Sequence, residues 1–126
     1  MYDRTLVVEI LRNIEWALNQ ILKRLSIIKS SDDFLKDDAG IEKLDSICMQ
    51  LINIGEMLKQ FDKLGASELL ERYSGIDWKK AKGMRDIISH HYFDIDAEIV
   101  YAVCNDHLPV MSEIIATILQ DLDDTA

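Results

Sequence analysis

The chain has 126 residues, of which 48% are apolar, with one proline, five glycines and a net charge of −9. This length suits one domain with a sizeable hydrophobic core, so we expect a single domain over residues 1–126. The low proline and glycine content argues against a disordered chain or a β-sandwich, and the acidic surface as a whole repels nucleic acid.

The sequence predicts neither a secretory signal peptide nor a membrane span. Charged residues interrupt every apolar run near the N-terminus, and the longest apolar runs are far shorter than the roughly 20 residues of a membrane-spanning helix. Cys48 and Cys104 fall in helical patterns and are expected to be buried thiols, with a disulfide or a metal pair as the less favoured alternative. A cytoplasmic protein is the resulting prediction.

The first quarter of the chain has the apolar spacing of one long amphipathic helix over residues 5–29. Apolar residues recur every seven positions, with leucines four positions after the first three of them: Val7, Ile14, Ile21 and Ile28, with Leu11, Leu18 and Leu25. The polar residues 30–33 then end this helix and supply N-cap side chains for a short turn.

A second long helix is predicted over residues 39–61. Its expected buried stripe is Ile41, Leu44, Cys48, Leu51, Gly55 and Leu58, flanked by Ile47, Ile54 and Phe61. A glycine inside a helix costs about 1 kcal/mol relative to alanine. We therefore expect Gly55 to be the point where another backbone approaches closely.

Two shorter helices should follow. Residues 67–73 form the first, which ends at Ser74 and Gly75. Asp77 is a suitable N-cap for the second, which carries a basic segment.

The last long helix is predicted over residues 97–122, behind an N-cap at Asp94 or Asp96. Pro109 should kink it near residues 104–106, because the proline ring removes a backbone hydrogen bond. No segment has the alternation of a β-strand. The predicted fold is therefore all-α, an antiparallel up-and-down bundle of four main helices plus short helices.

Residues 83–93, Gly-Met-Arg-Asp-Ile-Ile-Ser-His-His-Tyr-Phe, lie in the most basic part of the chain. Residues 79–91 carry a net charge of +3, which leaves −12 for the rest. Arginine is a permanent cation whose planar fork fits phosphate oxygens, and histidine exchanges protons near neutral pH. Arg85, His90 and Tyr92 therefore suit phosphodiester chemistry on RNA, although a solvated helix face also explains such a charge cluster.

The helical geometry separates the two most chemically useful side chains. At 100° per residue, Arg85 and Tyr92 share one edge of the predicted helix, whereas His90 lies about 140° from Arg85. Either the helix loosens before Phe93, or two copies meet so that Arg85 of one chain works beside His90 of the other. The geometry favours a symmetric homodimer.

Each of these residues also has a structural explanation. Arg85 can pair with Asp86 or Glu56, and Tyr92 can pack in the core with its hydroxyl at the surface. The predicted inward-facing stripe consists of Ala81, Met84, Ile87, Ile88 and His91, which makes His91 a candidate core histidine. His90 lies on the polar side and has no evident structural task.

Other site chemistries find less support. The glycines stand apart, so there is no phosphate-binding loop, and no serine has the strand–turn–helix setting of a nucleophile. None of the three histidines follows a glutamate by three residues or has a zinc-binding spacing. We therefore expect no metal and no cofactor.

The segment Arg85-Asp86-x-x-x-His90-x-Tyr92 resembles the Arg-x4-His-x-Tyr motif of HepT-type proteins, the toxins of a class of bacterial toxin–antitoxin pairs within the HEPN superfamily. The likeness covers about residues 5–120 and includes Ile54-Gly55-Glu56, Asp77-Trp78, Gly83-Met84-Arg85, Phe93-Asp94-Ile95-Asp96, Val100-Tyr101 and Leu108-Pro109. The chain departs from the family pattern at Asp77, where proline is usual, and at Asp86, where asparagine is commoner. A carboxylate at position 86 is expected to temper affinity for RNA.

The resemblance implies a HEPN fold and a metal-independent RNA endonuclease that acts as a homodimer with two motifs at a shared cleft. His90 would then transfer protons, and Arg85 would stabilise charge on the phosphate. Asp86, Ser89 and His91 would support the site. The cations expected to guide the RNA backbone are Lys79, Lys80 and Lys82.

The resemblance also implies a partner. In a type VII toxin–antitoxin pair, a cognate minimal nucleotidyltransferase would neutralise the toxin by adenylylation of Tyr92. The alternative is a non-catalytic HEPN subunit that binds a nucleotidyltransferase and its nucleotide or substrate. A third possibility is a scaffold bundle in which Arg85 and His90 are replaceable.

Overall fold

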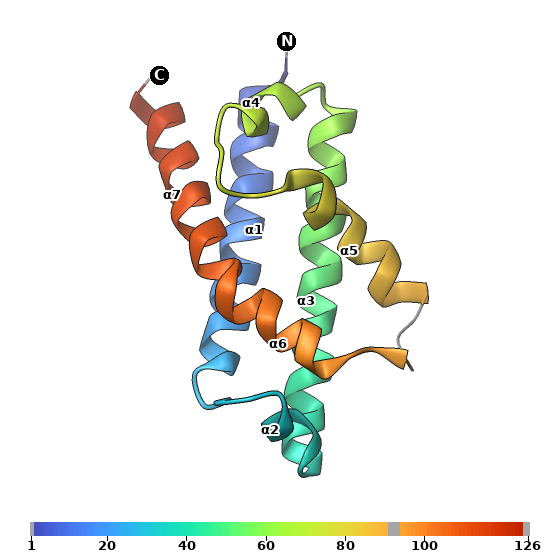
Figure 1. The fold of residues 1–126 in the computed structure, drawn as a ribbon. Helices are drawn as coiled ribbons and strands as arrows, with labels where there is room; N and C mark the ends of the chain where they lie inside the picture. The colour runs from blue at the N-terminus through green and yellow to red at the C-terminus, as the bar shows by residue number, and fades with distance from the viewer. Residues whose placement is uncertain (1, 91–93, 125–126) are drawn as a thin grey trace.

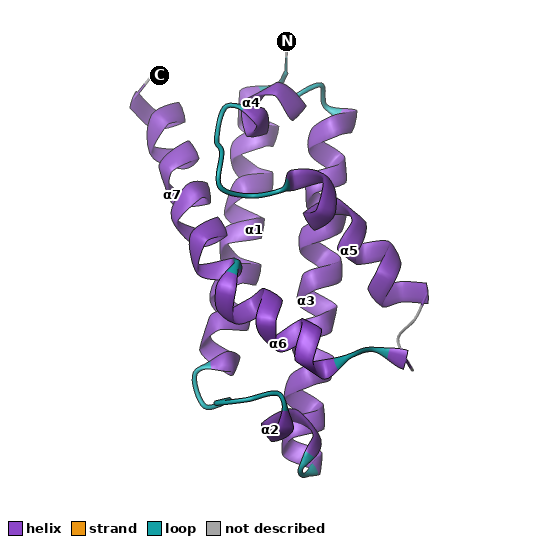
Figure 2. Ribbon diagram, in the orientation of Figure 1, coloured by secondary structure: helices purple, strands orange, loops and turns teal. Residues whose placement is uncertain are grey.

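The computed structural model describes residues 2–90 and 94–124. Within these ranges the chain is helical and contains no strand, which confirms the predicted all-α class (Figures 1 and 2). The helices are α1 (Arg4–Leu25), α2 (Asp32–Leu35), α3 (Asp38–Lys63), α4 (Ser67–Glu71), α5 (Trp78–His90), α6 (Ala97–Asp106) and α7 (Leu108–Asp124).

The long helices run alternately down and up the bundle (Figure 1). Helix α1 is the central helix and packs against both α3 and α7, whereas α5 packs against α3 and slants away from the bundle. Helix α1 buries the face that its apolar spacing predicts. In α1 that face is Val7, Ile10, Leu11, Ile14, Ala17, Leu18, Ile21 and Leu25.

Helix α3 begins at an aspartate cap, and its first turn differs from the prediction. The Gly40 backbone nitrogen donates to Asp37 Oδ1 at 2.8 Å. A Cβ atom at Gly40 would meet the backbone oxygens of Asp33 and Phe34, so this glycine is the position that faces α2. Ile41 comes one position later, turns outward and is 42% exposed, so its predicted burial is wrong.

The predicted last long helix is two helices. Helix α6 starts behind Asp96, whose carboxylate accepts a hydrogen bond from the Glu98 backbone nitrogen at 2.9 Å. The break falls at His107, and Pro109 lies in the first turn of α7. Proline suits a first helical turn because its missing N–H would have no partner there. The predicted kink is therefore a complete break between two helices, and it falls at His107 instead of at residues 104–106.

The core also contains the two cysteines. Cys48 and Cys104 are free thiols with exposed fractions of 1% and 0%. Burial raises the pKa of Cys48 to about 11 and that of Cys104 to about 12. The prediction of two buried thiols is confirmed. Across the described ranges, no helix combines the length and apolarity that crossing a membrane requires.

Candidate functional site

Helix α5 carries the basic motif and is anchored at its first turn. As predicted, the Asp77 carboxylate caps it and accepts a hydrogen bond from the Lys80 backbone nitrogen at 3.0 Å. The Trp78 indole nitrogen donates to the Tyr73 carbonyl at 3.1 Å, and the Trp78 side chain is 9% exposed. These contacts fix where the helix starts and therefore which of its faces meets α3.

The predicted close approach at Gly55 involves the motif arginine itself. A Cβ atom at position 55 would lie 2.7 Å from the Cβ of Arg85 and 3.2 Å from its backbone nitrogen. Cβ atoms do not come this close to other heavy atoms, so only glycine permits this contact. Gly55 thus brings the backbone of α5 against α3 at Arg85.

The guanidinium of Arg85 lies between two carboxylates. Its Nε atom is buried and forms an ion pair with Glu56, and its Nη1 atom donates to Asp86 Oδ1 at 2.9 Å. The Asp86 hydrogen bond and then the Glu56 charge raise the pKa of Arg85. The arginine is therefore a permanent cation held in one position, with 37% of its side chain exposed to a ligand.

Further ion pairs extend along the contact between α3 and α5. Lys59 Nζ lies 3.2 Å from both carboxylate oxygens of Asp86, and Lys82 Nζ lies 2.8 Å from Asp62 Oδ1. The pKa of Asp86 is lowered first by Arg85 and then by Lys59. Lys82 was predicted to guide RNA, but it is already occupied by this contact between helices.

Lys79 and Lys80 are the other two predicted RNA-guiding residues. Both are exposed, and neither has an ion-pair partner in the part of the chain that the structure describes. They are therefore the lysines of this segment that are open to a phosphate backbone.

His90 and Ser89 lie on the last turn of α5. Both residues are exposed, and their side chains have no hydrogen-bond partner among residues 2–90 and 94–124. The helix is continuous from Arg85 to His90. The offset of about 140° between these two residues is therefore retained, because the helix does not loosen before residue 90. The predicted site residues His91 and Tyr92 lie outside the described residues.

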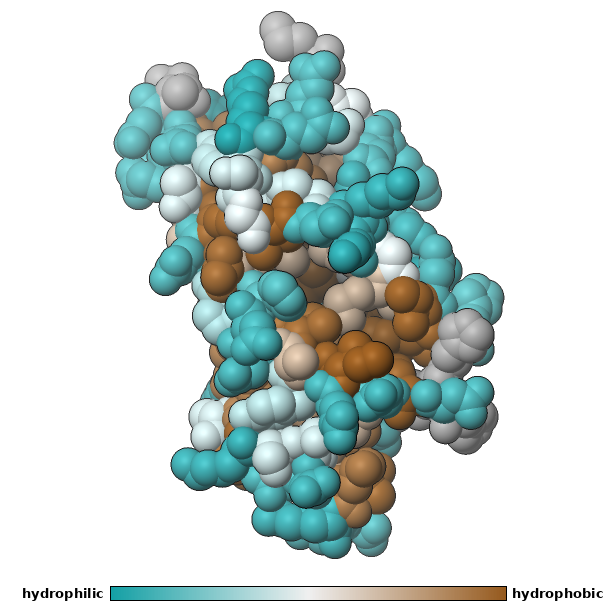
Figure 3. All heavy atoms as spheres, viewed as in Figure 1, coloured by the Kyte–Doolittle hydropathy of each residue, from teal (hydrophilic) through white to brown (hydrophobic). Residues whose placement is uncertain are grey.

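The outward face of α5 is open and partly apolar. No other helix of the described ranges has an atom within 4 Å of the place where a Gly83 Cβ would be. Ile87 is 61% exposed, so its predicted burial is wrong. Gly83, Ile87 and His90 are four and three residues apart and share this face. Figure 3 shows apolar side chains gathered where α5 and α6 lie, and Ile99 of α6 is also 61% exposed.

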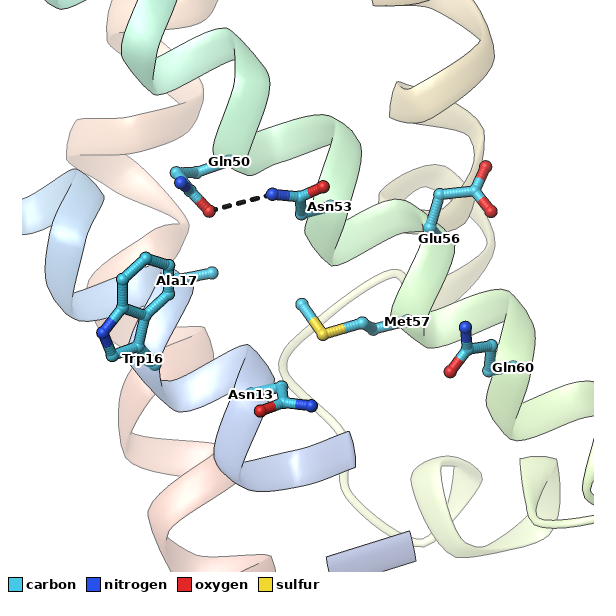
Figure 4. A pocket seen from close by; sticks show the side chains of 8 residues that line it. All are labelled: Asn13, Trp16, Ala17, Gln50, Asn53, Glu56, Met57 and Gln60. Atoms are coloured by element: carbon cyan, nitrogen blue, oxygen red, sulfur yellow. Dashed lines mark hydrogen bonds between the residues drawn. The ribbon is translucent and has the colours of Figure 1, made fainter. Parts of the chain in front are cut away.

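A groove of about 380 Å³ runs between α1 and α3 (Figure 4). Glu56 lies at its edge, so one residue borders both the groove and Arg85. The residues that line it are Asn13, Trp16, Ala17, Gln50, Asn53, Glu56, Met57 and Gln60. The sequence signal for it is a row of polar residues on α3 at helical spacing, which by itself does not point to the motif.

No three His, Cys, Asp or Glu side chains within the described ranges group closely enough to hold a metal ion. The structure brings together a fixed cation and two carboxylates, and it places an exposed histidine on a different side of the same helix. Such groups can bind a phosphate and exchange protons.

The sequence matches the model of one protein family, described as "Ribonuclease HepT-like", over residues 8–118. This match covers the whole motif segment, including Arg85, His90 and Tyr92.

Individual relatives agree with that match. The chain is 30% identical to a Methanocaldococcus jannaschii protein named "Gamma-glutamylcyclotransferase and putative RNase", over 89% of this chain and 50% of the relative. It is 31% identical to a "Putative RNase" of Caldanaerobacter subterraneus subsp. tengcongensis, over 72% of this chain and 75% of that protein. The chain thus spans about half the length of the first relative. No solved structure matches it.

Proposed function

This chain belongs to the HepT-like ribonuclease family, and from that membership we propose that it is a metal-independent RNA endonuclease. In this proposal it acts as a homodimer and is the toxin of a type VII toxin–antitoxin pair. Arg85 holds the scissile phosphate and stabilises its charge in the transition state, while His90 exchanges a proton with the 2′-hydroxyl or the leaving oxygen.

The observation that carries the proposal is the placement of Arg85. Gly55 and Glu56 hold this arginine at the contact between α3 and α5, with part of its guanidinium exposed. An arginine that only joins two helices can be covered completely, whereas an arginine that binds phosphate needs part of its guanidinium to be accessible. The exposed His90 on the same continuous helix adds a proton-transfer group that no described residue restrains.

The homodimer is supported by the outward face of α5. A glycine in a helix interior costs about 1 kcal/mol relative to alanine, and no other helix among residues 2–90 and 94–124 comes within 4 Å of a Cβ atom placed at the half-buried Gly83. A second copy packed on Gly83 and Ile87 would cover this face and bring the His90 residues of both chains to the interface. A shared site further requires that this interface extend to the exposed edge of Arg85, which lies on the side of α5 that meets α3.

The test of catalysis uses protein expressed without an antitoxin. Wild-type protein should cleave RNA in the presence of EDTA, and Arg85→Ala and His90→Ala should each lower the rate at least 100-fold with unchanged helical content. Arg72→Ala and His107→Ala are matched controls, since both residues are exposed and remote from the motif. Loss of wild-type cleavage in EDTA would indicate a metal enzyme, and equal activity of all variants would reject this site.

We further propose that a cognate minimal nucleotidyltransferase neutralises the protein by adenylylation of Tyr92. An adenylate attached two residues from His90 adds a phosphate that Arg85 can bind in place of the substrate. After incubation with the nucleotidyltransferase, ATP and magnesium, mass spectrometry should locate adenylate on Tyr92. Tyr92→Phe should stay active under the same conditions; neutralisation of that variant would mean inhibition by binding alone.

One observation favours the alternative of a non-catalytic partner of a nucleotidyltransferase. Both Glu56 and Asp86 already contact Arg85, and a phosphate must compete with them. If this alternative holds, the purified wild-type dimer binds the nucleotidyltransferase but leaves RNA uncut in the assay above.

A further inference from the structure

We propose that the groove between α1 and α3 binds a nucleobase of the RNA substrate, next to the phosphate at Arg85. This inference rests on the proposed function and assigns to it a substrate subsite outside the Arg–His motif. The residues that carry it are Asn13, Trp16, Gln50, Asn53, Met57 and Gln60, which we call the amide groove (Figure 4).

The lining of the amide groove suits a neutral ligand that forms hydrogen bonds. Four of its side chains are primary amides, each with two N–H donors and a carbonyl acceptor. Asn53 Nδ2 donates to Gln50 Oε1 at 3.2 Å, which leaves the Asn53 carbonyl and the Gln50 amino group for a ligand. The side-chain amides of Asn13 and Gln60 make no hydrogen bond within the described residues, so they are available as well.

Trp16 supplies an aromatic plane beside these amides. Its side chain is 56% exposed, whereas Trp78, the other tryptophan, is 9% exposed. Unstacked RNA bases bind proteins by stacking on aromatic side chains while amides and backbone groups read their edges. A tryptophan and four amides around a groove of about 380 Å³ supply both kinds of contact within the range of small-molecule sites, roughly 300–1,000 Å³.

The charges of the lining decide between ligand classes. No lysine or arginine lines the amide groove, so a phosphate has no cation inside it. The primary amides would lose their hydrogen bonds to water beneath an apolar protein surface. A planar, uncharged and polar ring satisfies both the amides and the indole, and a nucleobase has this chemistry.

Glu56 connects the amide groove to the proposed catalytic site. It lies at the edge of the groove and forms an ion pair with Arg85, which neutralises its own repulsion of RNA. When the base of a nucleotide enters the groove, its phosphate is therefore close to the guanidinium of Arg85. The groove thus adds base recognition to a motif that by itself contacts only the backbone.

Trp16 provides a direct signal of binding. Titration of wild-type protein with a short 2′-O-methyl oligonucleotide, which is not cleaved, should quench tryptophan emission to saturation because the stacked base quenches Trp16. An oligonucleotide of equal length with abasic sites should bind at least tenfold more weakly. Trp16→Phe should bind the intact oligonucleotide with less than half of the wild-type quenching, since Trp78 remains buried.

Steady-state cleavage then separates the groove from the catalytic groups. Trp16→Ala and Gln60→Ala should each raise KM for RNA about tenfold and change kcat less than twofold, because they remove base contacts only. Ile27→Ala, which truncates a 62% exposed side chain away from the groove, is the matched control. Circular dichroism checks that each variant is folded.

The outcomes also distinguish this inference from the proposed function. Saturable quenching by the intact oligonucleotide without any cleavage of RNA would support the subsite and reject the nuclease. Cleavage with equal KM for wild type, Trp16→Ala and Gln60→Ala would overturn the subsite and leave the nuclease intact. A Trp16 emission that depends on protein concentration in the absence of oligonucleotide would also overturn it, because a second copy would then cover the groove.

Discussion

At the scale of single residues, the guanidinium of Arg85 is held in place by the next residue in the sequence, Asp86, and by Glu56 of helix α3. Asp86 follows Arg85 directly and bonds both to its guanidinium and to Lys59 of α3. These contacts order the arginine, but they place a negative charge where a phosphate would bind. We therefore expect Asp86 to hold the Arg85 side chain in position and, at the same time, to lower the affinity of the site for RNA.

The variant Asp86→Asn tests this balance. Asparagine keeps the size of the side chain and removes the charge, so RNA should bind about fivefold more tightly, the modest gain expected from one exposed charge. KM at low salt is the measurement, and the gain should shrink as salt screens the charges. Asp106→Asn removes an exposed carboxylate at the end of α6 and should leave KM unchanged. Weaker RNA binding by Asp86→Asn would show that order matters more than charge.

At the scale of helices, Gly55 of α3 and Gly83 of α5 lie inside helices but differ in what surrounds them. Gly55 is in contact with the backbone of α5, whereas Gly83 faces open space within its own chain. Alanine is the better helix former at either position by about 1 kcal/mol. Whether alanine actually stabilises the protein at either position depends on the space around the added methyl group.

Alanine substitution should therefore have opposite effects on the two helices. Gly55→Ala should lower the thermal midpoint and the cleavage rate, because a methyl group 2.7 Å from the Cβ of Arg85 forces α5 away from α3. Gly83→Ala should raise the free energy of unfolding of the monomer by about 1 kcal/mol. If a second copy packs on α5, Gly83→Ala should also weaken the dimer, which analytical ultracentrifugation measures. A stable, fully active Gly55→Ala protein would contradict the account of α3 and α5.

The sequence predicted these helices where local signals agree with the tertiary structure. Apolar repeats located α1 and α3, and Asp77 and Asp96 located the starts of α5 and α6. The close approach of another backbone at Gly55 was also predicted, because a glycine inside a helix is unfavourable unless it serves such a contact. The identity of the approaching residue did not, because it depends on how α5 is placed against α3.

The wrong predictions have physical causes beyond local spacing. Ile41 and Ile87 fit apolar stripes but are exposed, since a periodicity gives a face without giving its width. The role of Lys82 in guiding RNA stays a prediction; its ion pair with Asp62 of another helix depends on the packing of α5 against α3 and could not be read from the basic cluster in sequence. The amide groove joins residues of α1 and α3 that are more than 30 positions apart, and no local pattern relates them.

At the scale of the whole molecule, the two thiols report on global unfolding. Cys48 of α3 and Cys104 of α6 are both in the core. Burial in the folded state raises the pKa of Cys48 to about 11 and that of Cys104 to about 12, from about 9 for an exposed thiol. Groups of this kind contribute stability that is present below the pKa of the unfolded state and is lost as pH rises toward the pKa of the folded state.

The free energy of unfolding should therefore stay nearly constant from pH 7 to about 9 and fall between about 9 and 12. Urea denaturation at pH 8 and pH 10 measures this change. Cys104→Ala should show a smaller decrease than the wild-type protein. An equal decrease in both proteins would assign the alkaline loss to other groups, with Tyr73 as the first candidate, because its hydrogen bond to Asp121 raises its pKa to about 12.

The distribution of charge and exposed apolar surface fits a molecule that works as a pair. The chain carries −9 overall, and Lys79 and Lys80 are the cations of the basic segment left open to RNA. One copy thus offers little positive surface and keeps Arg85 and His90 on different sides of α5. Two copies would double the positive surface, and an interface that includes both the outward face of α5 and the exposed edge of Arg85 would combine the two side chains.

The central claim, a site shared between two chains, is tested most directly by mixing inactive variants. Arg85→Ala and His90→Ala proteins, each inactive alone, are unfolded and refolded together in equal amounts, and RNA cleavage is measured in EDTA. Random pairing makes half of the dimers mixed, each with one intact site of two, so about a quarter of the wild-type activity should return. No recovery of activity, with mixed dimers verified by two different affinity tags, would contradict a shared site.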